Sequence, residues 1–435
     1  MNAHEHARRR QQLMRQMGAG GIAILPAAPE RRRNRDVDHS YRQHSDFLYL
    51  TGFPEPEAVA VLIPGRAQGE YLLFCRERDP EMETWHGRRA GLEGACADYG
   101  ADDAFPIGDL DDILPGLLEN TERVYASMGG DPAFDRRLLD WINTVRAKSR
   151  AGINAPVEFI DLDHLLHEMR LFKSPAELRL MRQAAAISCA AHVRAMRACR
   201  PGLSELDLEA ELQYGFATGG ARHPAYPSIV GGGANACILH YTENGSRLRR
   251  GDLVLIDAGA EVEGYAADIT RTFPVGRRFN RAQRAIYQLV LEAQRAALEA
   301  VRPGNHWNAP HDAAVEVLAS GLVGLGLLKG RPKQVIAKGT YRRFYMHRTG
   351  HWLGLDVHDV GDYKVGGEWR VLEPGMTLTI EPGLYLPAGA KGVGPRWADI
   401  GVRIEDDVLV TADGHEVLTE AAPKGIEEVE ALRGG

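Results

Sequence analysis

The chain has 435 residues, of which 44% are hydrophobic and 26% are charged, as in an ordinary globular protein with a full core. Its net charge of −7 argues against nucleic acid as the main partner. The amino-terminal stretch has basic residues but lacks the apolar run of a signal peptide, and no apolar run reaches spanning length. We therefore expect two or three domains, no membrane association and a cytoplasmic location.

The cysteines agree with a reducing compartment. They are scattered, odd in number and form no CxxC motif, so we expect reduced thiols in place of a disulfide framework. Their positions are Cys75, Cys96, Cys189, Cys199 and Cys237.

Residues 1–172 alternate short apolar runs with helical patterns, which predicts an α/β domain. A charged run at 31–36 is typical of a solvated loop, with binding or subunit contact as the alternative. The segment ETWHGRR holds Trp85, which either packs on its own domain or contacts a neighbouring subunit. The predicted strands are 21–25, 58–63, 71–75, 124–128 and 157–161, and the predicted helices are 138–148 and 164–172.

A capping signal at Ser174-Pro175 opens the second part of the chain, because Glu177 completes a capping box. The helix predicted there ends at Pro201-Gly202, and Ser204 opens another that ends at Gly219-Gly220. The same order recurs: a helix over 282–301 ends at an Arg-Pro-Gly sequence, and a further helix lies around 310–323.

The repeat extends to the strands. Residues 248–259 align without gaps on residues 372–383, which places Asp257 over Glu381. Chance could supply one of these matches, but both in the same order favour two related halves. The sequence thus predicts an α+β protein with a duplicated carboxy-terminal domain.

Four carboxylates lie in or beside apolar, β-branched runs that are typical of buried strands: Asp257, Asp268, Glu381 and Glu405. A buried ionised carboxylate is costly unless it is paired or binds metal. Four such groups with one histidine suit two divalent cations of the Mn, Co or Zn kind better than one structural zinc. The pattern indicates a two-metal hydrolase centre.

Local geometry adds three expectations. Residues 251–259 and 264–273 predict an antiparallel hairpin turned at Glu263-Gly264, across which Asp257 and Asp268 could face each other. Strand alternation places Arg403 on the same face as Glu405, where a cation would help to keep the acid ionised. Glu381 precedes Pro382-Gly383 and so lies at a strand end.

The sequence determines the roles of the histidines less well than those of the carboxylates. His347, His351 and His358 are separated by glycines and suit a loop and strand more than one helix, and His240 is a fourth candidate. One would complete the metal set, while the others would donate protons or stabilise an oxyanion. Spacing leaves open which histidine binds metal.

The set Asp257, Asp268, His351, Glu381 and Glu405 resembles, in order and type, the five ligands of the metallopeptidases with the pita-bread fold. This family includes methionine aminopeptidase, prolidase and the Xaa-Pro aminopeptidases. The segments SDFLYLTGFPEPEAV, ETWHGRR, HYTENG and HWLGLDVHDVG are similar to the bacterial Xaa-Pro aminopeptidases in particular. The resemblance covers the whole chain, and it implies an amino-terminal domain of the creatinase/aminopeptidase P type at 1–172 and a catalytic pita-bread domain at 173–435.

The resemblance also implies roles for the ligands. Asp268 and Glu405 would bridge two ions, most simply Mn²⁺ with Co²⁺ or Zn²⁺ as alternatives, and Asp257 would hold one of them. His351 and Glu381 would hold the other, and a hydroxide bridging the ions would be the nucleophile. Glu381 would relay a proton to the leaving proline nitrogen.

Further roles follow from the same resemblance. His358 and His240 would bind the substrate carbonyl and the developing oxyanion, and His347 would help to shape the site. Arg403 would support the ligands, and Tyr363 would contact substrate. The departure from the family is Arg348-Thr349-Gly350, where small or apolar residues are common, and it bears on fine substrate preference.

The implied activity is release of the first residue from peptides with proline in second position. Two alternatives stay open: a prolidase that cuts only Xaa-Pro dipeptides, and a non-catalytic peptide-binding protein on the same fold. The segments ETWHGRR and RQHSDFLYLTGF favour the aminopeptidase, and the complete ligand set disfavours the binding protein. The resemblance further implies a homodimer or homotetramer in which Trp85 reaches a neighbour's site.

Overall fold

The structure is a computed structural model that describes residues 1–434, and the chain divides into two compact units. The first unit is residues 1–169 and the second begins at Arg170. The domain boundary predicted from the sequence, between residues 172 and 173, lies three residues after this division and stays a prediction. Among residues 1–434, no helix combines the length and the apolarity that crossing a bilayer requires.

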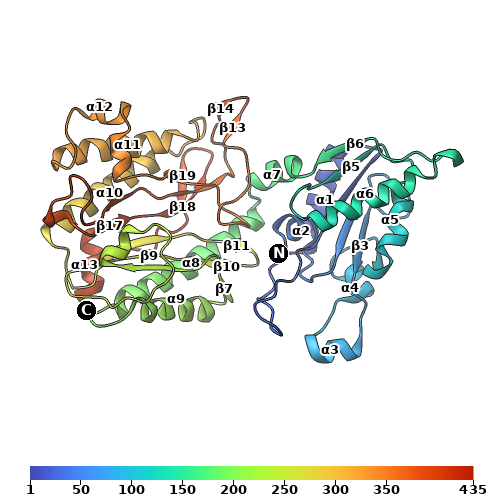
Figure 1. The fold of residues 1–435 in the computed structure, drawn as a ribbon, viewed down its shortest axis with the longest axis horizontal. Coiled ribbons are helices and arrows are strands. Elements are labelled where there is room, and N and C mark those ends of the chain that lie inside the picture. The colour runs from blue at the N-terminus through green and yellow to red at the C-terminus, as the bar shows by residue number, and fades with distance from the viewer. Residues whose placement is uncertain (435) are drawn as a thin grey trace. The chain divides into compact units, whose positions relative to one another are not determined.

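A six-stranded mixed sheet forms the centre of the first unit, in the order β4-β3-β2-β1-β5-β6 (Figure 1). The pairs β1/β2 and β2/β3 are antiparallel. The pairs β1/β5, β5/β6 and β3/β4 are parallel. The strands are β1 Gly21–Pro26, β2 Val59–Leu62, β3 Tyr71–Cys75, β4 Asp103–Pro106, β5 Arg123–Ala126 and β6 Glu158–Asp161. The five predicted strands are confirmed, and β4 was not predicted because its residues are only half-buried.

Helices cover this sheet. Apolar side chains of α5 and α6 pack on one face, against Ile22, Ile24 and Val124. Helix α1 was not predicted, because its buried face carries Arg9 and Arg10, whose guanidinium groups donate to the carbonyls of Tyr49 and Leu50. The helices of this unit are α1 Ala3–Met17, α2 Ser45–Thr51, α3 Pro80–His86, α4 Gly91–Ala97, α5 Leu110–Leu118, α6 Pro132–Arg146 and α7 Asp163–Leu171, the last ending in the second unit.

The second unit consists of two similar halves. In the first half α8 (Pro175–Ala198) packs on α9 (Glu205–Gly219), and in the second α10 (Arg281–Glu299) packs on α11 (Ala309–Gly324). Capping boxes start the first two helices: the box at Ser174 is the one the sequence predicts, and at Ser204 the predicted helix start has a box with Asp207 as well. Short helices α12 (Pro332–Ala337) and α13 (Ile426–Gly434) complete the helical part.

The strands repeat in the same way and confirm the duplication. Strand β9 pairs antiparallel with β12 in the first half, and β15, which the aligned segment places over β9, pairs antiparallel with β18 in the second. Each pair carries a third strand, β8 beside β9 and β19 beside β18. Smaller sheets are β7-β10-β11, β16-β17 and β13-β14. The bounds are β7 His223–Pro224, β8 Ile229–Gly232, β9 Leu253–Asp257, β10 Ala260–Val262, β11 Tyr265–Ala266, β12 Thr270–Pro274, β13 Lys364–Val365, β14 Glu368–Trp369, β15 Thr377–Ile380, β16 Gly383–Leu386, β17 Ile400–Arg403, β18 Asp406–Val410 and β19 His415–Val417.

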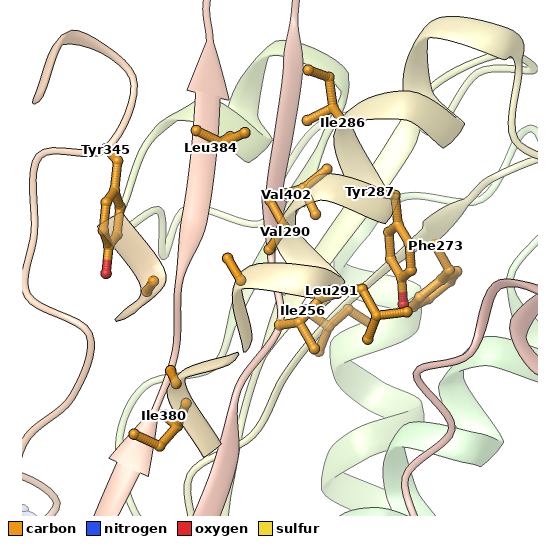
Figure 2. Packing of buried hydrophobic residues seen from close by; sticks show 14 of the residues in the cluster. Ile256, Phe273, Ile286, Tyr287, Val290, Leu291, Tyr345, Ile380, Leu384 and Val402 are labelled. Carbon is orange, nitrogen blue, oxygen red and sulfur yellow. The ribbon is translucent and has the colours of Figure 1, made fainter. Parts of the chain in front are cut away.

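One apolar core joins the two halves. Figure 2 shows Ile286, Val290 and Leu291 of α10 directed at the strands that carry Ile256, Leu384 and Val402. These side chains are almost completely buried. Because strands of both halves pack against the same helix, their ends are held at fixed positions, and the polar residues at those ends gain a rigid base.

Candidate metal centre

A cavity of about 440 Å³ lies among the strand ends of the second unit. Every residue of this unit that the sequence proposes for the site lines it; Trp85 belongs to the other unit, on α3, and is 77% exposed. The proposed site residues on its wall are His240, Asp257, Asp268, His347, His351, His358, Tyr363, Glu381, Arg403 and Glu405.

The first half contributes Asp257, the last residue of β9, and Asp268, just before β12. The predicted turn at Glu263-Gly264 is present, but the hairpin is divided into β9/β12 and β10/β11, and Asp257 pairs with Thr270. The two aspartates are therefore offset along the hairpin and not directly paired, but their side chains meet on one face of it. The hydroxyl of Tyr226 lies between them, 2.7 Å from Asp257 Oδ1 and 2.5 Å from Asp268 Oδ1.

The second half contributes Glu381, directly after β15, and Glu405, directly before β18. The Glu381 N–H donates to the Thr349 carbonyl at 2.8 Å. Thr270 of the first half binds Glu405 twice: its carbonyl accepts from the Glu405 N–H, and its hydroxyl donates to Glu405 Oε2 at 2.6 Å. Strand ends of both halves thus fix the four carboxylates in one cavity.

Among the histidines, His351 lies closest to the carboxylates. Its Nε2 is 3.4 Å from Asp268 Oδ2 and 3.8 Å from Glu381 Oε1, while Nδ1 is 2.9 Å from the Trp352 carbonyl and can donate to it. That hydrogen bond favours the tautomer whose Nε2 lone pair faces the cavity. Asp268, His351 and Glu405 each offer a ligand atom within 4.8 Å of the others.

The other histidines adjoin this group. His358 stacks edge-on against His351, with the ring centroids 4.2 Å apart. His347 Nε2 lies 2.9 Å from the hydroxyl of Tyr385. Burial, followed by the charge of Arg403, lowers the pKa of His347 to about 3, so this ring stays neutral. The pKa of His358 is also lowered, by burial and then by His351.

The electrostatics of the carboxylates are uneven. Burial and mutual repulsion raise the pKa of Glu381 to about 7 and that of Glu405 well above its ordinary value, and they also raise the pKa of Asp268. Burial acts in the same direction on Asp257, but the charge of Arg403 and the hydrogen bonds from Tyr226 and Arg403 together outweigh it and lower the pKa. Arg403 Nη2 lies 2.5 Å from Asp257 Oδ2, so this cation serves Asp257 more directly than Glu405, its neighbour on the strand face.

The residues present fit divalent metal ions. Four carboxylates share the cavity wall with two guanidinium groups, those of Arg403 and Arg348, and negative charge is in excess. Three of the four carboxylates have raised pKa values, through burial and mutual repulsion. Bound cations would offset that repulsion. Oxygen donors with one imidazole nitrogen are a ligand set that Mn, Co and Zn all tolerate.

Sequence reasoning missed several residues that support the carboxylates. Tyr226 and Thr270 bind them directly, and Asp407 accepts the Asp268 N–H at 3.1 Å. Strand alternation could have indicated Asp407, because positions 403, 405 and 407 share one face. Tyr226, which lies between two prolines, carries no comparable signal.

The departure at Arg348 also lies on the cavity wall. Its guanidinium carbon is 5.1 Å from the ring centroid of Trp369, and Nη2 donates to Asn308 Oδ1. Trp307 and Tyr363 continue this aromatic side of the cavity, with ring centroids 4.6 Å apart. A stacked cation at this position provides a polar contact for a bound molecule beside an otherwise aromatic wall.

Comparisons with known proteins agree with this geometry. Residues 179–412 match the model of metallopeptidase family M24, and residues 6–125 match that of the aminopeptidase P amino-terminal domain. The Xaa-Pro aminopeptidase of Escherichia coli is 47% identical, covering 99% of this chain and 98% of the relative. The solved structure of Pseudomonas aeruginosa aminopeptidase PepP has a TM-score of 0.99 at 62% identity, covering 100% of this chain and 98% of that one. Proline aminopeptidase P II from Yersinia pestis has a TM-score of 0.97 at 47% identity, with 100% of both chains covered.

Proposed function

The chain belongs to metallopeptidase family M24, and from this membership we propose that it is an Xaa-Pro aminopeptidase. It hydrolyses the bond between the first residue of a peptide and a proline in second position. The observation that carries the proposal is the convergence of four carboxylates, three of them buried, and His351 in one cavity of about 440 Å³. A cavity of that size accommodates the first residues of a peptide.

Two divalent metal ions belong to this centre, and we propose that they are Mn²⁺. Asp257, Asp268, His351, Glu381 and Glu405 would hold them, with Asp268 and Glu405 shared. When bound, the ions supply Lewis acidity and a water of lowered pKa. The Arg403 guanidinium keeps Asp257 ionised, and the Tyr226 hydroxyl orients its Oδ1.

The protein's own groups perform the remaining steps. His358 and His240 line the cavity and would donate hydrogen bonds to the substrate carbonyl as negative charge develops on its oxygen. Glu381 would take up a proton and pass it to the proline nitrogen. A carboxylate placed beside the scissile bond is suited to take up a proton and to return it to the leaving nitrogen.

Proline explains why a dedicated site is needed. The Xaa-Pro bond is a tertiary amide without an N–H, and the ring fixes φ, so peptidases that bind an extended backbone through that N–H accept it poorly. His347 and Arg403 line the cavity, and the buried Tyr385 hydroxyl behind them joins the two into one polar surface, because it meets both the His347 ring and Arg403 Nη1. We propose that this surface shapes the site around the proline ring, with Tyr363 contributing on the aromatic side.

The deciding experiment uses metal-stripped protein with Xaa-Pro-Yaa tripeptides and Xaa-Pro dipeptides, before and after addition of Mn²⁺. Manganese-dependent release of the first residue from the tripeptide supports the aminopeptidase. Cleavage of the dipeptide alone would make the protein a prolidase. Cleavage of neither, with metal bound, would leave a non-catalytic peptide-binding protein.

His358→Ala separates binding of substrate from binding of metal. Because His358 would contact the carbonyl and not the ions, we expect kcat to fall by about 10²-fold or more while metal content is unchanged. Metal analysis beside steady-state kinetics measures both quantities. A loss of metal in this variant would assign His358 to the ligand set.

Three finer proposals concern the whole protein. Trp85 is exposed on α3, and we propose that it contacts a neighbouring subunit in a dimer or tetramer. Light scattering of the wild type and of Trp85→Ala tests that contact. The five free cysteines support a cytoplasmic location, and replacement of Mn²⁺ by Co²⁺ or Zn²⁺ tests the identity of the metal.

A further inference from the structure

Two histidines of the cavity stand near the two ends of one short loop. His351 precedes the loop, His358 ends it, and their rings are in edge-on contact. The intervening residues, 352–357, form turns and not a regular helix or strand. The loop therefore needs bonds beyond its own backbone if His358 is to keep one position.

Asp359, the residue after His358, provides such bonds. Its Oδ2 lies 2.9 Å from Lys173 Nζ and its Oδ1 lies 2.6 Å from Arg170 Nη2. The same Arg170 nitrogen is 2.7 Å from Asp356 Oδ2. The side chains of Asp359, Lys173 and Arg170 are each at most 2% exposed.

The backbone closes the loop around this cluster. The Asp359 N–H donates to the Trp352 carbonyl at 2.9 Å, and the Gly354 N–H donates to the Asp356 carbonyl at 3.1 Å. A Cβ at Gly354 would lie 2.2 Å from Asp359 Oδ2 and 2.9 Å from Lys173 Cε. The loop thus fits closely around the carboxylate, and glycine at 354 is required for the fit.

Lys173 is anchored independently of the loop. The Lys173 N–H donates to the Gly375 carbonyl at 2.8 Å, and Phe172 forms a β-bridge with Met376, just before β15. Strand β15 leads directly to Glu381. The charged cluster therefore ties the histidine loop to the same strand that presents a proposed metal ligand.

Stability alone does not explain a charge cluster of this kind, because removing three charged groups from water offsets much of what their attraction contributes. Burial acts to raise the pKa of Asp359, but Lys173 and Arg170 outweigh it and lower the pKa, so the carboxylate stays ionised. Because these bonds are directional and lie next to a functional histidine, we interpret the cluster as a means of positioning that histidine and not as a packing element.

We propose that Asp359, held by Arg170 and Lys173, is a positioning residue that fixes His358 in the substrate cavity. The catalytic consequence rests on the proposed aminopeptidase function, whereas the fixing of the loop does not. Asp359 acts through His358 and touches neither substrate nor metal. Its removal should therefore impair the chemical step only as far as His358 contributes to it.

A double-mutant cycle tests this coupling. Asp359→Asn keeps the shape of the side chain and removes its charge, and we expect kcat on an Xaa-Pro tripeptide to fall by about 10- to 100-fold with bound Mn²⁺ unchanged. In a His358→Ala background the same change should alter kcat by less than about twofold, because neighbours that act together are not additive. Additive losses in the two backgrounds would overturn the proposal.

Asp356→Asn is the matched control. Asp356 lies in the same loop and binds the same Arg170 nitrogen, but its side chain is 43% exposed. We expect its kcat to stay close to that of the wild type. Should Asp359→Asn fail to fold, Lys173→Met removes one of its cations and keeps Arg170, and the cycle is run with that variant.

Hydrogen exchange of residues 350–362 provides a readout that needs no peptidase activity. We expect faster exchange of this segment in Asp359→Asn than in Asp356→Asn, with the remaining core unchanged. Equal exchange in the two variants would overturn the proposal. If the wild type cleaved no peptide while the segment loosened selectively, the proposed function would fail and the positioning of the loop would stand.

Discussion

Glu405 and Asp406 are consecutive, fully buried carboxylates that point to opposite sides of the same chain segment. On one side, Glu405 faces Asp268 and Glu381 across the cavity, and burial followed by their repulsion raises its pKa well above the ordinary value. On the other side, Asp406 is surrounded by donors. Arg271 and Lys424 outweigh the effect of burial and lower its pKa.

The bonds account for this difference. Both oxygens of Asp406 are occupied: Arg271 Nη2 and the Thr419 hydroxyl donate to Oδ1, and Gln294 Nε2 and Lys424 Nζ donate to Oδ2. Its charge is balanced by the protein itself. The charge of the Glu405 region is not balanced by side chains, and a buried acid of this second kind indicates a place for a cation from outside the chain.

Glu405→Ala is expected to have the largest effect, because it removes a carboxylate from the cavity in which negative charge is in excess. Because Glu405 is proposed to serve both ions, we expect loss of bound metal together with a fall in kcat of at least about 10³-fold. Metal analysis after dialysis, beside kinetics in excess Mn²⁺, measures the two effects. A variant that retained two ions per chain would refute the ligand assignment.

Asp406→Asn tests the balanced side. It leaves the buried charges of Arg271 and Lys424 without their anion, so we expect a loss of about 3–5 kcal/mol in the free energy of unfolding. The metal content and the kcat of the folded fraction should remain close to those of the wild type. Urea unfolding with parallel metal analysis checks this, and a stable variant lacking metal would contradict the division of roles.

Much of the fold follows from local sequence signals. The capping box at Ser174, the helix start at Ser204 and the apolar runs for β1 to β3 predict elements that the structure contains. Helix α1 escaped prediction because the carbonyl partners of its buried arginines lie some 40 residues away. The hairpin and its turn were predicted, but the offset of Asp257 from Asp268 was not, nor was the close approach of Gly259 to the Ala267 carbonyl, where a Cβ would lie 1.7 Å away.

The residues of the site also fall into those that local sequence signals predict and those that they do not. Residue type and strand context indicate the four carboxylates, and alternation separates Glu405 from Asp406. What spacing could not supply was the choice of histidine, the pairing of Arg403 with Asp257, and Tyr226. Those contacts join residues far apart in sequence, such as Arg403 and Asp257, 146 positions apart, and they depend on how the two halves pack.

Tyr226→Phe tests how much a neutral hydrogen-bond donor contributes to metal affinity in the carboxylate cavity. The variant keeps the ring and removes the hydroxyl that contacts Asp257 and Asp268. Loss of a group that orients ligands typically lowers metal affinity by about 10- to 100-fold, and we expect an effect at the low end of this range. Titration of the metal-free protein with Mn²⁺ measures it, and an unchanged affinity would make the hydroxyl irrelevant to the ligands.

Glu381→Gln in metal-free protein has the smallest expected effect. It tests most directly whether Glu381 makes the folded state less stable as pH rises. The pKa of Glu381 is about 7 in the folded chain, mainly through burial, against an ordinary value of 4.5. Between these values the folded state binds more protons than the unfolded state, so stability falls as pH rises through 7. Asp406, with its lowered pKa, has the opposite dependence, because its contribution is present above 3.8 and is lost as pH falls through its folded value.

Removing the acid at position 381 should therefore raise the Tm of the metal-free protein at pH 8, by about 2–4 °C, and the gain should shrink toward pH 5. Thermal unfolding at several pH values, with chelator present throughout, measures this difference. Added Mn²⁺ should reverse the order, because the wild type then gains stability from ions that the variant binds poorly. A variant less stable than the wild type at pH 8 without metal would mean that the protein balances the charge of Glu381 by itself, as it does for Asp406.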